Sequence, residues 1–210
     1  MALLLPARAA ASTLALRTVV REDHGMQSMS APQQNASRSV TPNRPPPARM
    51  FLTTPAVGPI TDHEIDAVAA LMRATIQPLT YYNDRAIRAE LTKYTADTLR
   101  AMIAGDPQAV LVARDNAGPV GFCVSRCDDG TIWLSWFGTA VRARGRGVGA
   151  ALLAALAATL PSRHAHKIWC DSRVDNTESK SVLERAGYRR IATLTNHWYG
   201  QDYFLWEWYP

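Results

Sequence analysis

The sequence contains one glycine-rich segment with the composition of a phosphate-binding loop, made of Arg144, Gly145, Arg146, Gly147, Val148, Gly149 and Ala150. It follows a strand-like stretch and opens an alanine- and leucine-rich stretch that favours a helix. Glycines let backbone N–H groups turn toward an anion without a Cβ in the way. A helix N-terminus adds a partial positive charge. With two arginines nearby, these residues could hold a pyrophosphate.

The same segment also fits the dinucleotide-binding pattern G-x-G-x-x-A, with Asp171 about a strand later. That fold begins a parallel βαβαβ unit at the loop, whereas the strand before this loop belongs to an Asp129-Gly130 hairpin. About 60 residues follow the loop, too few to complete a dinucleotide fold. A Walker loop is excluded because no Gly-Lys-Ser/Thr follows. A tight strand-to-helix turn without a ligand is the remaining alternative.

The elements that would position this loop can be read from the hydrophobic pattern. Thr61-Asp62-His63-Glu64 is a capping-box pattern, and apolar residues follow it at helical spacing to Ile76. A second helical stretch, 83–104, contains a predicted break near Thr95. The rest is predicted as three antiparallel strands, 108–115, 120–126 and 132–141, then helix 148–160, strand 167–174, helix 177–186, and a final hairpin of strands 188–198 and 202–209.

Length, charge and cysteine content restrict the class of protein. The 210 residues carry a formal net charge of +5, but residues 1–49 hold six arginines and two acidic residues, so residues 50–210 are nearly neutral. A nucleic-acid groove needs clustered charge in the folded part, so we expect no nucleic-acid partner. No apolar run approaches the roughly 18 residues of a membrane span, so we expect no membrane partner. The three cysteines have no metal-ligand spacing and are predicted to be reduced.

The first 49 residues are predicted to form a disordered extension or leader, with one domain over 50–210. Residues 1–20 contain two arginines, serine and threonine but no acid, as in a mitochondrial presequence, and residues 30–49 are rich in Pro, Ser, Asn and Gln. An upstream start codon wrongly chosen is the alternative. The 20 arginines against three lysines favour a GC-rich bacterial genome, and so a cytoplasmic protein. A genuine leader would place it in the mitochondrial matrix.

Two segments resemble the GNAT N-acetyltransferase superfamily. The family's pyrophosphate motif, Gln/Arg-x-x-Gly-x-Gly/Ala, is met by Arg144, Gly147 and Gly149. Residues 171–188 resemble the Glu-Val-Arg-x-x-Asn, helix and Gly-Phe series of ribosomal-protein alanine N-acetyltransferases. The order of elements over 50–210 also matches. The resemblance implies an α/β (α+β) fold, with a mixed, mostly antiparallel central sheet of about six to seven strands flanked by about four helices.

The resemblance further implies acetyl-CoA as co-substrate and no metal. Residues 144–150 would hold its pyrophosphate. Asn176 would hydrogen-bond its pantetheine arm, although Asn before a helix is also a good N-cap. The same arm would lie along strand backbone, at Phe137, Gly138 and Thr139.

Transfer to an amine requires a general base, because an amine near pH 7 is almost wholly protonated. Asp171 stands where the similar enzymes keep a Glu and is the leading candidate, the alternative being an ion pair with Arg173. His197 has a suitable intrinsic pKa. Leu183 replaces the tyrosine that commonly protonates the departing thiolate, and Tyr199 and Tyr203 could substitute for it.

The aromatic C-terminal hairpin, with Trp136 and Tyr81-Tyr82, could wall a pocket for a cationic amine. The resemblance therefore implies an acyltransferase that acetylates an amine-bearing small molecule, a protein N-terminus or a lysine, working as a monomer or homodimer. A non-catalytic acyl-CoA sensor or interaction domain is the alternative, because Leu183 cannot donate a proton.

Overall fold

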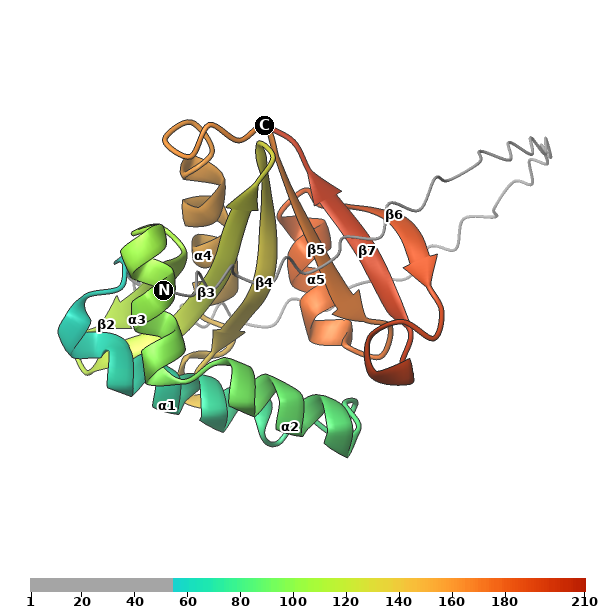
Figure 1. The fold of residues 1–210 in the computed structure, drawn as a ribbon, viewed down its shortest axis with the longest axis horizontal. Helices are drawn as coiled ribbons and strands as arrows, with labels where there is room; N and C mark the ends of the chain where they lie inside the picture. Colours follow the sequence, from blue (N-terminus) through green and yellow to red (C-terminus); the bar gives the residue numbers. More distant parts are fainter. Residues whose placement is uncertain (1–54) are drawn as a thin grey trace, which may run out of the picture. The chain divides into compact units, whose positions relative to one another are not determined.

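The computed structural model describes residues 55–210, which build one seven-stranded sheet in the order β1-β2-β3-β4-β5-β7-β6 (Figure 1). The strands are β1 Ala56–Pro59, β2 Val110–Asp115, β3 Gly118–Asp128, β4 Thr131–Thr139, β5 Lys167–Arg173, β6 Arg189–Leu194 and β7 Tyr203–Trp208. The helices are α1 Ile65–Ile76, α2 Asp84–Lys93, α3 Ala96–Gly105, α4 Val148–Ala158 and α5 Thr177–Arg185. Every strand pair is antiparallel except β4–β5. The predicted mixed, mostly antiparallel fold is confirmed. The extension predicted over 1–49 lies outside the described residues.

The structure has one helix more than the four expected, because the stretch 83–104 divides into α2 and α3. The division falls at the predicted break. Tyr94 leaves the helical conformation, and the Thr95 hydroxyl accepts a hydrogen bond from Thr98 N–H at 3.2 Å, which caps α3. Strand β1 was not predicted, because a four-residue Ala-Val-Gly-Pro segment carries no alternating pattern. It is an edge strand, where a proline is tolerated.

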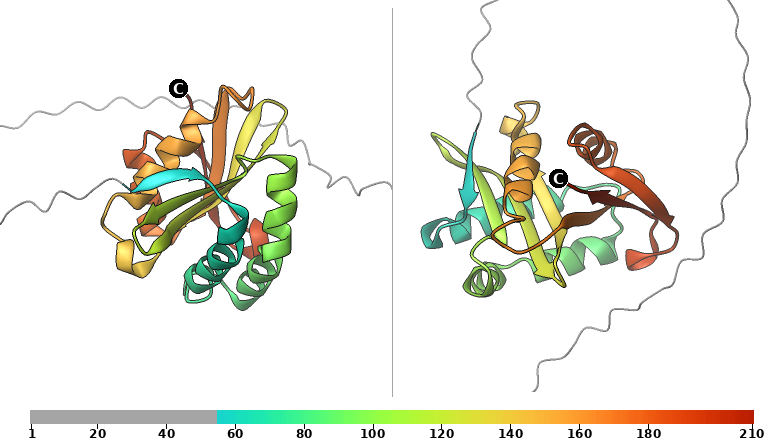
Figure 2. Two further views of the ribbon diagram at one scale, coloured as in Figure 1. Left: turned by 90° about the vertical axis from the view of Figure 1, so that its left-hand side faces the viewer. Right: turned by 90° about the horizontal axis from the view of Figure 1, so that it is seen from above.

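Helices cover both faces of the sheet (Figures 1 and 2). Alternating residues of β2 divide between two cores, as the two-residue period of a strand requires. Val110 and Val112 pack with α1 and α3 on one face. Leu111 and Ala113 pack with α4 on the other, in the core that α5 also joins. Strands β2 to β4 are therefore packed against helices on both faces of the sheet, and they form the buried centre that supports the site.

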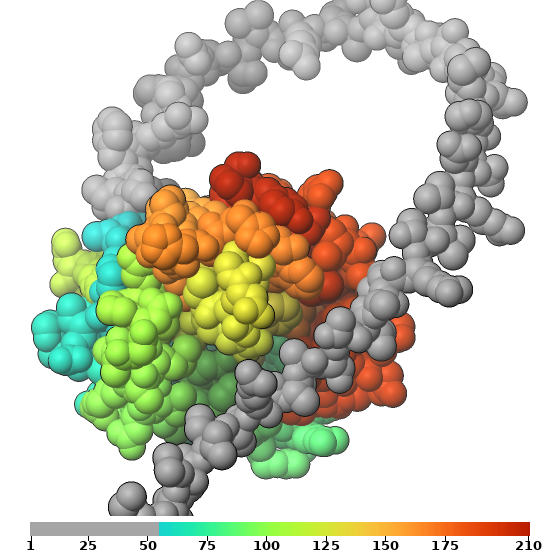
Figure 3. All heavy atoms as spheres, turned by 45° about the horizontal axis from the view of Figure 1, so that its top comes forward, coloured from blue at the N-terminus to red at the C-terminus, as the bar shows by residue number. Residues whose placement is uncertain are grey.

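The central strands β4 and β5 part halfway along. Their parallel pairing covers only 131–134 opposite 167–170. Beyond it, β4 continues on β3 to Thr139 and β5 continues on β7 to Arg173. The paired end is held by His166 N–H donating to Gly130 O at 2.9 Å, where the segment before β5 lies beside the β3–β4 turn (Figure 3). The other end is open. Beyond Leu134, the edge of β4 that faces β5 has no strand of residues 55–210 paired to it.

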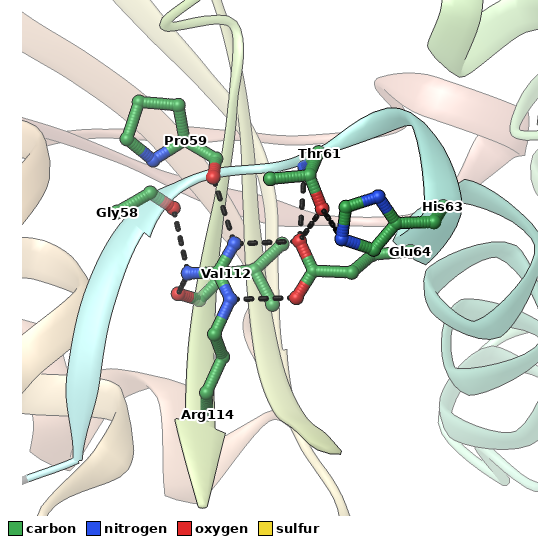
Figure 4. A network of polar contacts seen from close by, with 7 residues as sticks. All are labelled: Gly58, Pro59, Thr61, His63, Glu64, Val112 and Arg114. Carbon is green, nitrogen blue, oxygen red and sulfur yellow. Dashed lines mark hydrogen bonds and ion pairs between the residues drawn. The ribbon is translucent and has the colours of Figure 1, made fainter.

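A polar network anchors the beginning of the domain (Figure 4). The predicted capping box forms, with Glu64 Oε2 accepting from Thr61 N–H at 2.9 Å. It caps a short 3₁₀ turn, Asp62–Glu64, that leads into α1. Arg114 of β2 donates to both Glu64 oxygens, at 2.6 and 2.7 Å. The same guanidinium donates to the backbone oxygens of Gly58, Pro59 and Val112. One ion pair thus joins β1, β2 and the start of α1.

Replacing Glu64 by Gln is expected to lower the free energy of unfolding at pH 7 by about 1–3 kcal/mol, the contribution of hydrogen bonds to a charged group. The Arg114 guanidinium is the main cause that lowers the pKa of Glu64 from 4.5 to about 2. The contribution is therefore complete above about pH 4.5 and is lost as the pH falls toward 2. Denaturant unfolding at pH 7 and about pH 3 measures the difference between wild type and variant, which should shrink at the lower pH.

The matched control is Asp97→Asn, which removes an exposed ion pair with Arg100. Such a pair contributes under about 1 kcal/mol. Equal losses in the two variants at both pH values would contradict the role given to Glu64.

Over residues 55–210, no helix is long and apolar enough to cross a membrane. In the same range, no group of three or more His, Cys, Asp or Glu side chains could hold a metal ion. Cys123 and Cys170 are buried and Cys127 is exposed, all three as free thiols.

Candidate functional site

The glycine-rich loop turns from β4 into α4, as its sequence predicts. Gly145 and Gly147 have φ angles of +72° and +79°, and Gly147 is the N-cap residue of α4. A side chain in this left-handed region costs about 1–2 kcal/mol, so glycine suits both positions. The first helical bond runs from Ala151 N–H to Gly147 O at 3.0 Å. The N–H groups of Val148, Gly149 and Ala150 precede it and have no partner within the helix.

This helix start lies at one end of a groove of about 610 Å³. Six of the seven loop residues line the groove; Arg146 is the exception and is exposed. Arg144 brings a positive charge to the lining, with Glu178 of α5 at 3.7 Å. Unpaired N–H groups, a helix N-terminus and an arginine are features from which anion-binding sites are built.

The groove continues along the open half of β4. Phe137, Gly138 and Thr139 line it beyond the point where β5 leaves. A Cβ on Gly138 would lie 2.5 Å from the Phe122 ring and 3.0 Å from a Thr75 methyl group. Glycine at this position therefore lets α1 and the sheet approach closely. This half-strand pairs with β3 along one edge, and its other edge can hydrogen-bond an extended ligand as another strand would.

Asn176 caps α5. Its Oδ1 accepts from Ser179 N–H at 3.0 Å, so the structural role anticipated for it is present. Asn176 also lines the groove, and the contact with a pantetheine arm stays a prediction.

A second cavity, of about 410 Å³, opens from the groove on the side of α2. Four residues line both cavities: Trp136, Phe137, Asn176 and Ser179. The walls of the second cavity, called the acceptor pocket below, are largely aromatic. They come from the α1–α2 connection, α2, β4, β7 and the β6–β7 loop, and they include Tyr82, Tyr94, Trp133, Trp136, Trp198, Tyr199 and Tyr203. Two carboxylates, Asp171 and Glu90, also line it.

Asp171 lies on β5 one residue after the pairing with β4 ends. Its Oδ2 accepts from the indole N–H of Trp198 at 2.8 Å. Burial is the main cause that raises the pKa of Asp171 to about 6. The carboxylate is therefore mostly ionised at pH 7 but close to the pKa that suits proton transfer. The alternative pairing with Arg173 does not form, because Arg173 binds Asp175 at 2.9 Å and the carbonyl of Tyr81 at 3.1 Å.

Glu90 was missed by the sequence analysis. It is buried, and it accepts hydrogen bonds from Trp136 Nε1 at 2.7 Å, Tyr199 Oη at 2.7 Å and Lys93 Nζ at 2.9 Å. The sequence feature that could have identified Glu90 is its spacing from Ala86. Residues four apart lie on the same face of a helix, and both of these residues are buried on α2. Three donors hold Glu90, whereas one donor holds Asp171, so Asp171 has the freer oxygen atoms.

The other candidate residues fall in different places. Tyr203 is buried and lines the acceptor pocket. Tyr199 lines it too, but its hydroxyl donates to Glu90. His197 is exposed beside Trp198, at 4.5 Å between ring centroids, and it does not line the pocket. Leu183 is fully buried in the core and lines neither cavity.

The β6–β7 loop is tied across the acceptor pocket to the α1–α2 connection. Asn83 Nδ2 donates to Tyr199 O at 3.0 Å, and Gln201 Nε2 donates to Tyr81 O at 3.2 Å. Tyr199 has a φ of +59°, a conformation few non-glycine residues adopt. These bonds hold the loop that carries Trp198 over Asp171 and Tyr199 over Glu90.

The model of the acetyltransferase (GNAT) family matches residues 74–188. No curated protein gives a significant sequence match. Among solved structures, the ribosomal-protein-alanine N-acetyltransferase of Brucella melitensis is 19% identical with a TM-score of 0.60, over 74% of this chain and 99% of that one. Salmonella typhimurium yncA, solved with its cofactor acetyl-CoA, is 16% identical with a TM-score of 0.61, over 75% and 94%. Ard1 of Thermoplasma volcanium is 19% identical with a TM-score of 0.59, over 75% and 98%. At these identities the solved structures establish the fold.

Proposed function

This chain belongs to the acetyltransferase (GNAT) family, and on that premise we propose that it transfers the acetyl group of acetyl-CoA to a cationic primary amine. One observation carries the proposal. A groove with an anion site at one end meets, at the gap between β4 and β5, an aromatic pocket that contains an ionisable carboxylate. The diphosphate of the donor fits the N-terminus of α4, and its pantetheine arm fits the open half of β4.

The acceptor pocket favours a cation. Aromatic faces attract ammonium groups, and the pocket adds the carboxylates of Asp171 and Glu90. Its basic lining residues are Lys93, bound to Glu90, and Arg126, whose guanidinium stacks on Trp133 at 5.7 Å. An amine that enters as its ammonium form must lose a proton before it can attack. Asp171, at the gap in the sheet, is the residue we assign to accept that proton.

The reaction then proceeds by direct attack. Asp171 passes the proton that it takes from the ammonium form to solvent and is ionised again. The neutral amine nitrogen then forms a bond to the thioester carbon, and the second proton that the nitrogen loses passes to Asp171 directly or through water. The C–S bond breaks, its electron pair goes to sulfur, and the thiolate takes up a proton as CoA leaves. The aromatic walls exclude bulk water, which strengthens the interactions of the carboxylate with the developing charge.

An amine panel tests the proposal. Wild-type protein with acetyl-CoA should release CoA in the presence of at least one class of amine among polyamines, amino acids, aminoglycosides, N-terminal peptides and lysine peptides. The rate of CoA release should be far higher with amines that are cationic near pH 7 than with amines that are neutral there. CoA should be measured by chromatography, because the exposed Cys127 thiol would react with a colorimetric thiol reagent. Calorimetry should show binding of CoA without an acceptor.

If the protein binds CoA but no amine causes acetyl-CoA to release CoA, the proposal is replaced by a non-catalytic acyl-CoA sensor. That alternative agrees with Leu183, which is buried and cannot donate a proton. Binding of NAD without binding of CoA would overturn both.

A further inference from the structure

Within the proposed function, on which this inference rests, we infer that Ser179 is a catalytic residue whose hydroxyl donates a hydrogen bond to the sulfur of CoA. If the donor lies in the groove and the amine in the acceptor pocket, the thioester must lie where the two cavities meet. Only four described residues line both cavities, and Ser179 is one of them.

The other three residues at this junction are less suited to donate a hydrogen bond to sulfur. Phe137 has no donor. The indole N–H of Trp136 is already bound to Glu90 at 2.7 Å. Asn176 points its side-chain oxygen at Ser179 N–H, as the cap of α5, which fixes the direction of its amide, whereas a serine hydroxyl can rotate toward sulfur. Within residues 55–210 the hydroxyl of Ser179 makes no hydrogen bond of its own, so its proton is available.

The tyrosines offered by the sequence are less well placed. Tyr199 and Tyr203 line the acceptor pocket but not the groove, and the Tyr199 hydroxyl is bound to Glu90. Leu183 lies one helical turn after Ser179 on α5. Helical side chains lean toward the N-terminus, so a long side chain at position 183 would extend over position 179. With leucine there, buried in the core, Ser179 is the residue of α5 that brings a hydroxyl to the junction of the two cavities.

The hydroxyl acts on the departing group. As the C–S bond breaks, sulfur gains the electron pair, and a donated O–H hydrogen bond stabilises that charge. Ser179 keeps its proton, because a serine hydroxyl is a far weaker acid than a thiol. The proton that finally reaches sulfur comes from protonated Asp171 or from water. No other reactant is required.

The thiol of bound CoA gives a readout that needs no acceptor. The ultraviolet absorbance of the thiolate should be titrated with pH for CoA bound to wild type and to Ser179→Ala. Loss of a hydrogen bond to a charged group should raise the pKa of the bound thiol, so that the thiolate fraction at a fixed pH falls about tenfold. Ser179→Thr keeps the hydroxyl and should behave as wild type.

Thr177→Ala is the matched control. Thr177 is an exposed hydroxyl residue on the same helix that lines neither cavity. It should titrate as wild type, and calorimetry should show equal CoA binding in all four proteins. With an active amine, Ser179→Ala should lower kcat about tenfold, with the KM values for both substrates unchanged.

An unchanged pKa for CoA bound to Ser179→Ala overturns this inference, whatever the amine panel shows. An absence of turnover with every amine overturns the proposed function, while the thiol titration still decides the role of Ser179. If Ser179→Ala does not fold, a wild-type thiol pKa in Ser179→Gly overturns the inference in the same way.

Discussion

Replacing Asp171 by Asn is expected to lower kcat by about 10²–10⁴-fold, the usual effect of removing a positioned general base. Asn keeps the size of the side chain and can still accept the Trp198 hydrogen bond, but it cannot take a proton. The KM for acetyl-CoA should barely change, because Asp171 does not line the groove. Initial rates with the best amine of the panel measure the effect.

The pH dependence provides an independent test of the same base. Burial raises the pKa of Asp171 to about 6, so the wild-type rate should fall as the pH drops through about 6 and the carboxylate becomes protonated. In Asp171→Asn that dependence should disappear, leaving only the protonation of the amine.

Asp129→Asn is the matched control for this variant. Asp129 lies on the β3–β4 turn with a φ of +47°, which Asn tolerates, and it lines neither cavity. It should retain wild-type rates. A near-normal rate in Asp171→Asn, together with a large loss in Glu90→Gln, would move the base to Glu90.

Replacing Gly147 by Glu is expected to weaken CoA binding by about 10²-fold or more. The new carboxylate would lie at the helix start proposed to hold the diphosphate, where juxtaposed like charges cost several kcal/mol and each 1.4 kcal/mol is tenfold in affinity. The same change at Gly149 adds a steric effect, because a Cβ there meets a Val182 methyl group at 3.3 Å. Calorimetry with CoA measures the loss.

Two variants separate charge from backbone strain. Gly147→Asn places a neutral residue that accepts a positive φ, and it should bind CoA much more tightly than Gly147→Glu. Gly130→Glu puts the same charge at another positive-φ glycine, at the opposite end of β4. It should bind CoA as wild type does. Equal affinities for Gly147→Glu and wild type, with both folded, would make the loop a simple turn.

The features that could be predicted from the sequence are those that depend on residues close together in the chain. The loop at 144–150 needs only glycines before a helix, and the capping box at Thr61 and the helix break near Thr95 need only a few residues each, so their positions were predicted correctly. Strand β1 was missed because its four residues form a strand only when β2 is beside them.

The site was harder to predict because its parts meet through long-range pairing. Glu90 and Tyr199 are 109 residues apart in the chain, yet they share a hydrogen bond. The pKa of Asp171 is raised by burial and lowered in part by the hydrogen bond from Trp198, which is 27 residues away in the chain, and no local pattern encodes either effect. The alternative considered for Asp171, an ion pair with Arg173, does not form for a similar reason, since Arg173 is held by the carbonyl of Tyr81 in the α1–α2 connection and by that of Asp202, just before β7.

The parting of β4 from β5 has a consequence for the abundance of the folded protein. Beyond the paired residues 131–134 and 167–170, the edge of β4 that faces β5 has no neighbouring strand in the described part of the chain, and the proposed donor would cover it. A molecule that binds only the folded chain raises the folded population by mass action, by about 2.7 kcal/mol at a hundred times its dissociation constant. With the proposed donor in the gap, resistance to proteolysis would follow the acyl-donor supply, and a starved cell would hold less of this protein without any change in its synthesis.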